Sequence, residues 1–274
     1  KGMAPVVFLK CPRTQLNAVR PYDSGGLKPA SICLFDPSRP QAPVSTIFHQ
    51  PDMAIRDLNL SFDARTIFFS GQSGATGYTW QLFEIGVDGT GLKQITRGQH
   101  HNISPCELPD GRLIFVSTRN RLWVTCQGGG SGVLFSCERD GSHVKLLSAN
   151  IDSDHTPQVL EDGRVMFTRW DYGIEKNVFA RHALWTMNPD GSNLSHLFVN
   201  TIEDPAGFWQ ARAGPGRSEI VATSGPHHSG QAGMMGVIWP PNGTEEPRGK
   251  GFRFITREIP SYCDTTCHFG YQDP

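Results

Sequence analysis

The sequence predicts an all-β fold, and three observations support this: the composition, a unit that repeats about every fifty residues, and a recurring Asp-Gly turn. Among the 274 residues are 30 glycines and 20 prolines, which mark turns and interrupt long helices. Hydrophobic residues make up 38% of the chain. No apolar run approaches the roughly 18 residues that cross a bilayer. We therefore expect a turn-rich β protein without a membrane span.

The charge balance argues against a polyanionic partner. The chain carries 25 basic and 26 acidic residues, a formal net charge of −1, and has no run of like charge. Surfaces that bind nucleic acids are strongly basic because they neutralise phosphates. The sequence thus predicts no nucleic-acid partner.

Three outer hairpins define the repeat. Each has two short apolar runs joined by Asp-Gly and then Ser or Thr, in residues 82–96, 134–148 and 184–198. The turn aspartates Asp88, Asp140 and Asp190 follow one another at intervals of 52 and 50 residues. Because Gly adopts positive φ without steric cost, this pattern favours a tight hairpin.

A second set of hairpins alternates with the first, in residues 58–70, 104–118 and 156–170. Their turn aspartates, Asp63, Asp110 and Asp162, are separated by 47 and 52 residues. A fourth copy follows in residues 214–225, and residues 6–10 with 30–37 suggest an incomplete early unit. Each repeat therefore holds at least four strands.

Four-stranded units that recur every 40 to 50 residues are typical of a β-propeller, whose blades bury their faces against one another. An irregular sandwich is the alternative, but it does not require the same hairpin at a fixed period. Over residues 55–225 the repeats resemble those of TolB-like propellers. We expect about five or six blades within residues 1–255, followed by a separate segment, 256–274.

Polar side chains gather where the inner strand of each blade begins. Aligning the inner hairpins on their aspartates places Arg56, Ile103 and His155 at one equivalent position, just before the first strand of the blade, which lines the central channel of a propeller. We expect a polar rim there, which His100, His101 and Asp152 would join. Asp154 and His155 are candidate catalytic bases. Ordinary polar loop ends give the same pattern, so both interpretations stay open.

Two loops stand out by composition. His227 and His228 lie in a Gly-rich stretch, residues 224–239, where an imidazole could bind a metal or transfer a proton. They are also candidate catalytic bases. The segment 168–185 is an insertion rich in aromatic and charged residues, which we expect either to carry binding or to cover the end of a blade.

The chain ends in an unusual cysteine motif. Cys263 and Cys267 are separated by three residues and followed by His268. The haem c attachment signature, C-x-x-C-H, has one residue fewer. A structural zinc site usually needs a second ligand pair, and a disulfide would leave the histidine unexplained. Haem attachment accounts for both thiols and the histidine if the loop bulges by one residue, so spacing alone leaves these chemistries open.

Several stretches together resemble the α subunit of hydrazine synthase: "DHTPQVLEDGRVMFTRWDY" (154–172), "LWTMNPDGS" (184–192), "GPHHSGQAGMMG" (225–236) and the terminal C-x-x-x-C-H-x-x-Y. The resemblance implies that Cys263 and Cys267 attach a haem c covalently and that Tyr271 is the axial ligand of a five-coordinate iron. His268 is then the alternative axial ligand, or a ligand of a second metal such as zinc. A tyrosinate ligand lowers the reduction potential of haem.

The same resemblance implies an oxidoreductase that condenses hydroxylamine, derived from nitric oxide, with ammonia. Its expected partners are the other subunits of a multi-haem complex, an electron-donor cytochrome and small nitrogen substrates. One alternative is a non-catalytic electron-transfer or scaffold cytochrome whose haem is six-coordinate through His268. Another is a haem-free propeller that serves as a binding module.

Covalent c-type haem is matured outside the cytoplasm. Either haem interpretation therefore predicts an exported protein, in a periplasm-like compartment or an organelle lumen, the anammoxosome if the resemblance holds. The α subunit of that family continues past the cysteine motif into a second haem site. We accordingly expect this chain to be part of a longer subunit or a relative with a reduced haem domain.

Overall fold

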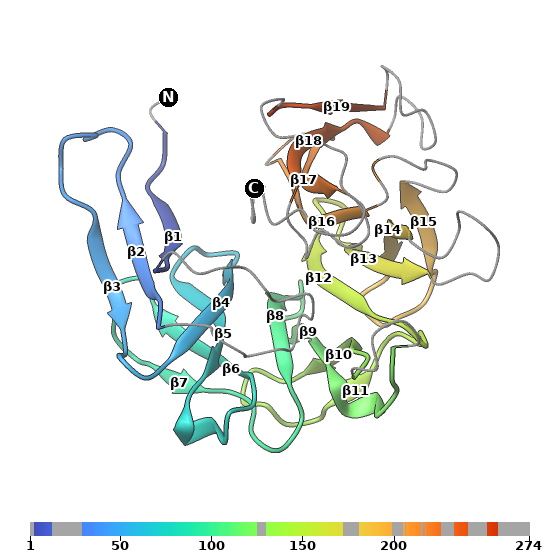
Figure 1. Cartoon of the computed structure of the whole chain (residues 1–274), viewed down its shortest axis with the longest axis horizontal. Coiled ribbons are helices and arrows are strands. Elements are labelled where there is room, and N and C mark those ends of the chain that lie inside the picture. The colour runs from blue at the N-terminus through green and yellow to red at the C-terminus, as the bar shows by residue number, and fades with distance from the viewer. Residues whose placement is uncertain are drawn as a thin grey trace.

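The computed structural model describes residues 3–12, 29–124, 130–171, 181–198, 205, 207–214, 216, 218–225, 233–240 and 251–256. Five antiparallel sheet units follow one another around a common centre, from the blue N-terminal sheet to the red C-terminal one (Figure 1). We number these units blade 1 to blade 5. The predicted propeller is confirmed, and of the predicted haem segment, 256–274, residue 256 alone is described.

The strands follow chain order within each blade. Blade 1 has β1–β3, blade 2 β4–β7, blade 3 β8–β11, blade 4 β12–β15 and blade 5 β16–β19. Their bounds are β1 (Val6–Lys10), β2 (Ser31–Phe35), β3 (Ser45–His49), β4 (Ala54–Leu60), β5 (Thr66–Gln72), β6 (Gln81–Gly86), β7 (Lys93–Gln94), β8 (Asn102–Glu107), β9 (Leu113–Ser117), β10 (Val133–Cys137), β11 (Lys145–Leu146), β12 (Asp154–Val159), β13 (Val165–Asp171), β14 (Arg181–Met187), β15 (Ser195–Phe198), β16 (Gly207–Ala213), β17 (Ile220–Gly225), β18 (Met234–Ile238) and β19 (Phe252–Phe254), with 3-10 helices η1 (Gly74–Thr76) and η2 (Thr118–Asn120). No helix in these residues is long and apolar enough to cross a membrane.

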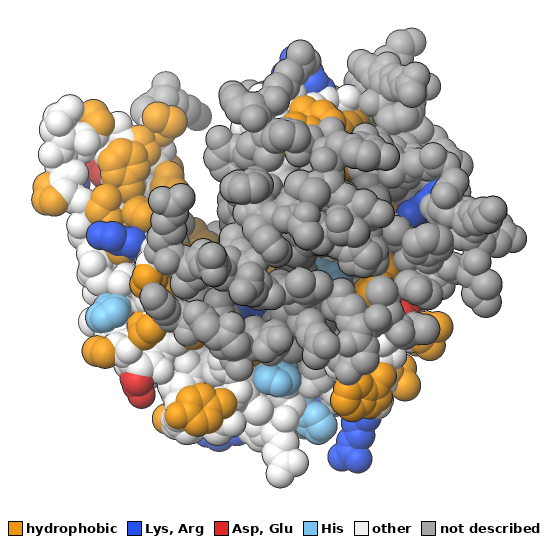
Figure 2. Space-filling model, in the orientation of Figure 1, with side chains coloured by type: hydrophobic (Ala, Val, Ile, Leu, Met, Phe, Trp, Pro, Cys, Tyr) orange, Lys and Arg blue, Asp and Glu red, His pale blue; other side chains and the backbone are white. Residues whose placement is uncertain are grey.

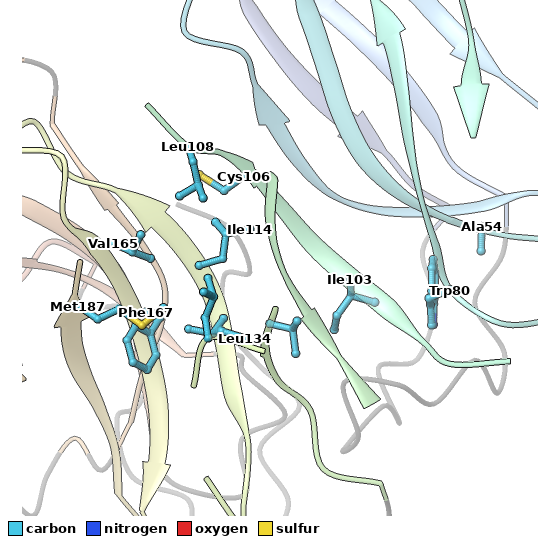
Figure 3. Packing of buried hydrophobic residues seen from close by; sticks show 12 residues of the cluster. Ala54, Trp80, Ile103, Cys106, Leu108, Ile114, Leu134, Val165, Phe167 and Met187 are labelled. Carbon is cyan, nitrogen blue, oxygen red and sulfur yellow. The ribbon is translucent and has the colours of Figure 1, made fainter. Parts of the chain in front are cut away.

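A hydrophobic cluster fills each interface between successive blades. Blades 3 and 4 meet through Ile114 and Leu134 on one side and Val165 and Phe167 on the other (Figure 3). Separate clusters join blade 1 to 2, 2 to 3 and 4 to 5. Burying one such side chain contributes roughly 1.5–3 kcal/mol. Because apolar residues occur in both hairpins of a repeat, a blade can pack against the blade before it and also against the blade after it.

The Asp-Gly turns have the backbone that the sequence predicts. In blade 3, Gly141 N–H donates to Glu138 O at 2.8 Å, and Glu138 N–H donates to Ser142 O at 2.9 Å. Asp140 Oδ1 accepts from the N–H of Ser142 at 2.9 Å. Gly141 has φ +85°, so the loop is a turn followed by a left-handed bulge residue. The same bonds recur around Gly89 and Gly191.

These glycines also contact the preceding blade. A Cβ built on Gly141 would lie 2.1 Å from Ile95 O, just past the outermost strand of blade 2. The corresponding distances are 2.7 Å from Gly89 to Ile47 O and 2.5 Å from Gly191 to Leu147 O. The outer turn of each of blades 2 to 4 thus packs on the edge of the blade before it. This contact explains why Asp-Gly recurs with the period of the blade.

The innermost strands β4, β8, β12 and β16 contact one another in series. Each contains a β-bulge at the equivalent position, and there one non-glycine residue has a left-handed conformation: Asp57 (φ 55°), Ser104 (φ 54°), Thr156 (φ 44°) and Gln210 (φ 54°). A bulge redirects the side chains on either side of it. All four inner strands therefore present matching layers of side chains to the axis of the molecule.

Gly141 and Gly111 offer a matched pair for testing the contact between blades. Both have left-handed φ, +85° and +86°, but a Cβ on Gly111 would have no atom within 4 Å. We expect Gly111→Ala to cost about 1–2 kcal/mol of unfolding free energy from backbone strain. Gly141→Ala should cost about 1–3 kcal/mol more because of the clash. Urea denaturation of both variants checks this, and equal losses would contradict the proposed contact.

Candidate functional site

The first candidate layer lies on the mouth side of the bulges, where the inner strands begin. Arg56, Ile103 and His155 occupy equivalent positions in β4, β8 and β12, as the alignment of hairpins predicts, and Trp209 of β16 joins them. They lie inside the strands rather than before them, because each inner strand begins two or three residues before its bulge. We call the end of the axis at this layer the mouth.

A second layer, beyond the bulges, closes the axis. It consists of Asn59, Cys106, Gln158 and Arg212, again at equivalent positions. Asn59 Nδ2 donates to Gln158 Oε1 at 3.1 Å, and Arg212 Nη2 donates to Leu58 O at 3.3 Å. These bonds join opposite blades directly across the axis. Burial raises the pKa of Cys106 to about 11, so this thiol stays protonated.

His155 is the buried imidazole of the mouth layer. Its side chain is 5% exposed, and Nδ1 has no hydrogen-bond partner among the described residues. Its pKa is lowered to about 4, chiefly by burial; the charge of Asp154 opposes this decrease, Arg56 adds to it, and Asp57 opposes it. His155 is therefore a neutral imidazole at neutral pH. A neutral imidazole can accept a hydrogen bond or bind a metal, but with this pKa it is a weak base.

Aromatic rings surround this imidazole at the interface of blades 4 and 5. The ring of His182 lies 6.2 Å from that of His155, 5.3 Å from Trp170 and 5.1 Å from Trp209, between centroids. His182 also pairs with Gly207, which joins β14 to β16 and merges the two blades into one sheet. A Cβ on Gly207 would strike the indole of Trp209. Glycine here allows Trp209 to fold towards the mouth.

Asp154, the other described candidate base, already accepts hydrogen bonds at both carboxylate oxygens. It has no exposed surface, and Arg169 Nε and Nη2 donate to its two oxygens at 2.8 and 3.1 Å. Ser148 Oγ donates at 2.6 Å and Asn150 Nδ2 at 3.3 Å. Asn102 occupies the same place in blade 3, where it bonds Gln81 and Ser117. These contacts give Asp154 a structural part in joining blade 3 to blade 4, and its catalytic role stays a prediction.

Asp171 is a titratable group that sequence reasoning did not single out. It ends β13 at the mouth, and the indole Nε1–H of Trp185 donates to its Oδ2 at 3.2 Å. Its pKa is raised to about 6, chiefly by burial; the hydrogen bond from Trp185 and the charge of Arg169 oppose this increase, and Asp154 and Asp152 add to it. A carboxyl with this pKa can both accept and release a proton near neutrality. The signal in the sequence was an aspartate between two aromatic residues at the start of the predicted insertion.

The remaining candidates fall outside the described residues. They are His227, His228, Cys263, Cys267, His268 and Tyr271. Of the strand that precedes the two histidines, β17, the end is described: it lies at Gly225, which pairs with Gly207 at the start of β16, on the mouth side of the sheet. Within the described residues no three His, Cys, Asp or Glu side chains could jointly hold a metal ion.

Comparison with known proteins supports the fold. No protein-family model matches the chain, and no curated protein matches it in sequence. Hydrazine synthase of Kuenenia stuttgartiensis is similar in structure, with a TM-score of 0.76 and 17% identity over 94% of this chain. The chain spans 40% of the length of that protein.

Two further solved structures have the same architecture. A TolB from Agrobacterium tumefaciens has a TM-score of 0.58 at 12% identity, covering 91% of this chain and 80% of its own. Puromycin hydrolase has a TM-score of 0.52 at 13% identity, covering 86% of this chain and 34% of its own. The chain therefore has a TolB-like propeller fold, and enzymes are among the proteins that it resembles in structure.

The pKa of His155 predicts acid sensitivity. The unfolded chain binds a proton at this residue below about pH 6.5, whereas the folded chain does so only near pH 4. Stability is thus lost as the pH falls through this window, by about 2 kcal/mol at pH 5. Replacing His155 with Phe should remove that part of the pH dependence in urea denaturation, while His49→Phe, at an exposed imidazole, should not. If the free energy of unfolding changed with pH in the same way in the wild type and in His155→Phe, this role of His155 would be disproved.

The structural role of Asp154 predicts a large loss of stability on substitution. Asp154→Asn would leave the guanidinium of Arg169, 6% exposed, without its counter-charge, at a cost of about 3 kcal/mol or more. Asp162→Asn breaks the exposed pair with Arg164 and should cost less than about 1 kcal/mol. Thermal and urea unfolding measure both. If Asp154→Asn kept full stability, its contacts would not have the role described.

Proposed function

We propose that this chain is the c-type haem-bearing propeller subunit of a hydrazine synthase-like complex. The observation that carries the proposal is the terminal motif, Cys263-x-x-x-Cys267-His268-x-x-Tyr271, directly after a TolB-like propeller. The structural similarity to hydrazine synthase over 94% of the chain supports it at the level of the fold. Neither a cysteine motif nor a propeller alone would specify this function.

The donor set of the motif suits a covalent haem. Cys263 and Cys267 would supply two thiols for thioether bonds, and the phenolate of Tyr271 would bind the iron as an anionic ligand that favours the ferric state. His268 is then available to bind zinc, or serves as the axial ligand in place of Tyr271. Bound haem would supply a redox-active iron with one open coordination position for small nitrogen compounds.

The reaction that we propose joins hydroxylamine to ammonia to give hydrazine and water. An N–N bond forms, the N–O bond breaks, the oxygen leaves as water, and the ammonia nitrogen gives up a proton. Among the described groups of the mouth, Asp171 has a pKa of about 6 and is suited to receive that proton. The neutral imidazole of His155 can accept a hydrogen bond from an amine. His227 and His228 remain candidate bases.

The proposal also includes the partners of the protein and its compartment. Other subunits of a multi-haem complex would reduce nitric oxide to hydroxylamine, and a cytochrome would supply the electrons for that reduction. Because covalent haem attachment takes place outside the cytoplasm, the protein would be exported, to a periplasm-like compartment or an organelle lumen such as the anammoxosome.

Absorption and haem staining test the proposal. The purified chain should show a Soret band with a high-spin ferric spectrum and retain haem after denaturation. Replacing both Cys263 and Cys267 with Ala should abolish the retained haem. Tyr271→Phe should change the high-spin spectrum, whereas Tyr262→Phe, just before the first cysteine, should leave it intact.

The same spectra distinguish the alternatives. A low-spin spectrum that is lost in His268→Ala would favour a six-coordinate electron-transfer or scaffold cytochrome. If the protein has no Soret band after export in a host that attaches c-type haem, both haem-dependent functions are wrong and a haem-free binding module is left. Hydrazine formation should be measured with the partner subunits present.

A further inference from the structure

An exposed patch of aromatic and basic side chains lies at the mouth of blades 2 and 3. Three loops form it, residues 73–80, 97–101 and 118–123. Tyr78 is 72% exposed and Trp123 69% exposed, although both are large enough to be buried in most proteins. The same three loops carry the basic residues Arg97, His100, His101 and Arg121. We call these six residues the aromatic–basic patch.

Hydrogen bonds hold the three loops together. Trp80 N–H donates to His101 Nδ1 at 3.2 Å, and Thr79 Oγ1 donates to Gly98 O at 3.1 Å, which joins the first loop to the second. Thr118 N–H donates to His101 O at 3.1 Å, and His101 N–H donates to Thr118 Oγ1 at 3.1 Å, which joins the second to the third. The patch is therefore preorganised, and a partner would not need to order it.

Two of the exposed side chains are held in a strained backbone conformation. Tyr78 has φ 57° and Arg121 has φ 55°; Arg121 directly follows the 3-10 turn η2, and Tyr78 lies two residues after the equivalent turn η1, beyond Gly77. The left-handed region is disfavoured for bulky residues and is usually occupied by glycine. Strain of this kind persists where the surroundings impose it, and it is concentrated at binding sites. Here it serves to display a phenol and a guanidinium to solvent.

The patch is positively charged. No Asp or Glu occurs in residues 73–81, 96–104 or 117–124. Burial lowers the pKa of His100, and the positive charges of Arg119 and Arg121 lower it further. On the face seen in Figure 2, histidine side chains lie between hydrophobic and basic ones along the lower edge. An occupant must therefore be acidic as well as partly apolar.

Protein, nucleic acid and sulfated saccharide are three classes of acidic occupant. Trp, Tyr and Arg are the residues that contribute most at protein–protein interfaces, whereas nucleic-acid sites are broad and rich in lysine and arginine. The whole chain has a net charge of −1, which does not suit a polyanion. We propose that the aromatic–basic patch docks an acidic, partly apolar surface of a partner protein. This inference is independent of haem.

A peptide probe tests the proposal on the intact chain. The probe is a fluorescein-labelled peptide of alternating glutamate and leucine, and fluorescence anisotropy measures its binding at low salt. Arg121→Gly removes the charge and also relieves the backbone strain. It should weaken binding at least tenfold without lowering Tm, so that loss of binding is not loss of folding. Trp123→Ser should weaken binding at least fivefold.

The controls use the opposite end of the same blades. Phe62, 64% exposed, and Arg65 form a comparable exposed pair in the β4–β5 turn. Phe62→Ser with Arg65→Ala should bind the probe like the wild type. The proposal is overturned if Arg121→Gly binds as well as the wild type, or if a lysine–leucine peptide binds equally. It is also overturned if a sulfated oligosaccharide binds more tightly than the peptide and does so independently of Trp123.

Discussion

The stacking of one blade on the next is the constraint on which the rest of this structure depends. A four-stranded sheet with apolar side chains on both faces cannot bury them by itself. Four hydrophobic clusters, one at each interface between successive blades, solve this problem in the described chain. The turn glycines Gly89, Gly141 and Gly191 complete the first three of these interfaces from the outside, because their lack of a Cβ lets the neighbouring backbone approach. The sequence therefore repeats because each blade must form the same interface with its neighbour, as well as the same four-stranded sheet.

Stacking also brings equivalent residues together at the centre. The left-handed bulge in each inner strand aligns two layers. The second layer, beyond the bulges, is joined across the axis by the hydrogen bonds of Asn59 with Gln158 and of Arg212 with Leu58. The mouth layer is left with a buried, neutral imidazole at His155 and, nearby in blade 4, a carboxyl at Asp171 whose pKa is close to neutral. A fold built from near-identical units thus acquires one chemically distinct end at blades 4 and 5.

That asymmetry has a structural cause. Blades 4 and 5 are joined by the His182–Gly207 bridge, and the rings of His182, Trp170 and Trp209 fill the space beside it. The same apolar surroundings exclude water from His155 and partly from Asp171, which moves both pKa values in the direction of the neutral form. At blades 2 and 3 the corresponding loops instead display Tyr78, Arg121 and Trp123 outwards. One mouth therefore combines titratable groups that are shielded from water with an exposed surface of aromatic and basic side chains.

The sequence by itself determined the repeat, the hairpins and the equivalence of Arg56, Ile103 and His155, since these follow from periodic hydrophobicity and from the conformational freedom of glycine. It also supplied the terminal cysteine motif, which rests on residues outside the described structure. Tertiary structure alone decided that Asp154 is paired with Arg169, that His155 is neutral, and that Asp171 has a raised pKa. It likewise revealed the closed axis and the exposed patch. The physical reason is that pairing, burial and the pKa of a side chain depend on neighbours distant in sequence, and no local pattern records which blade faces which.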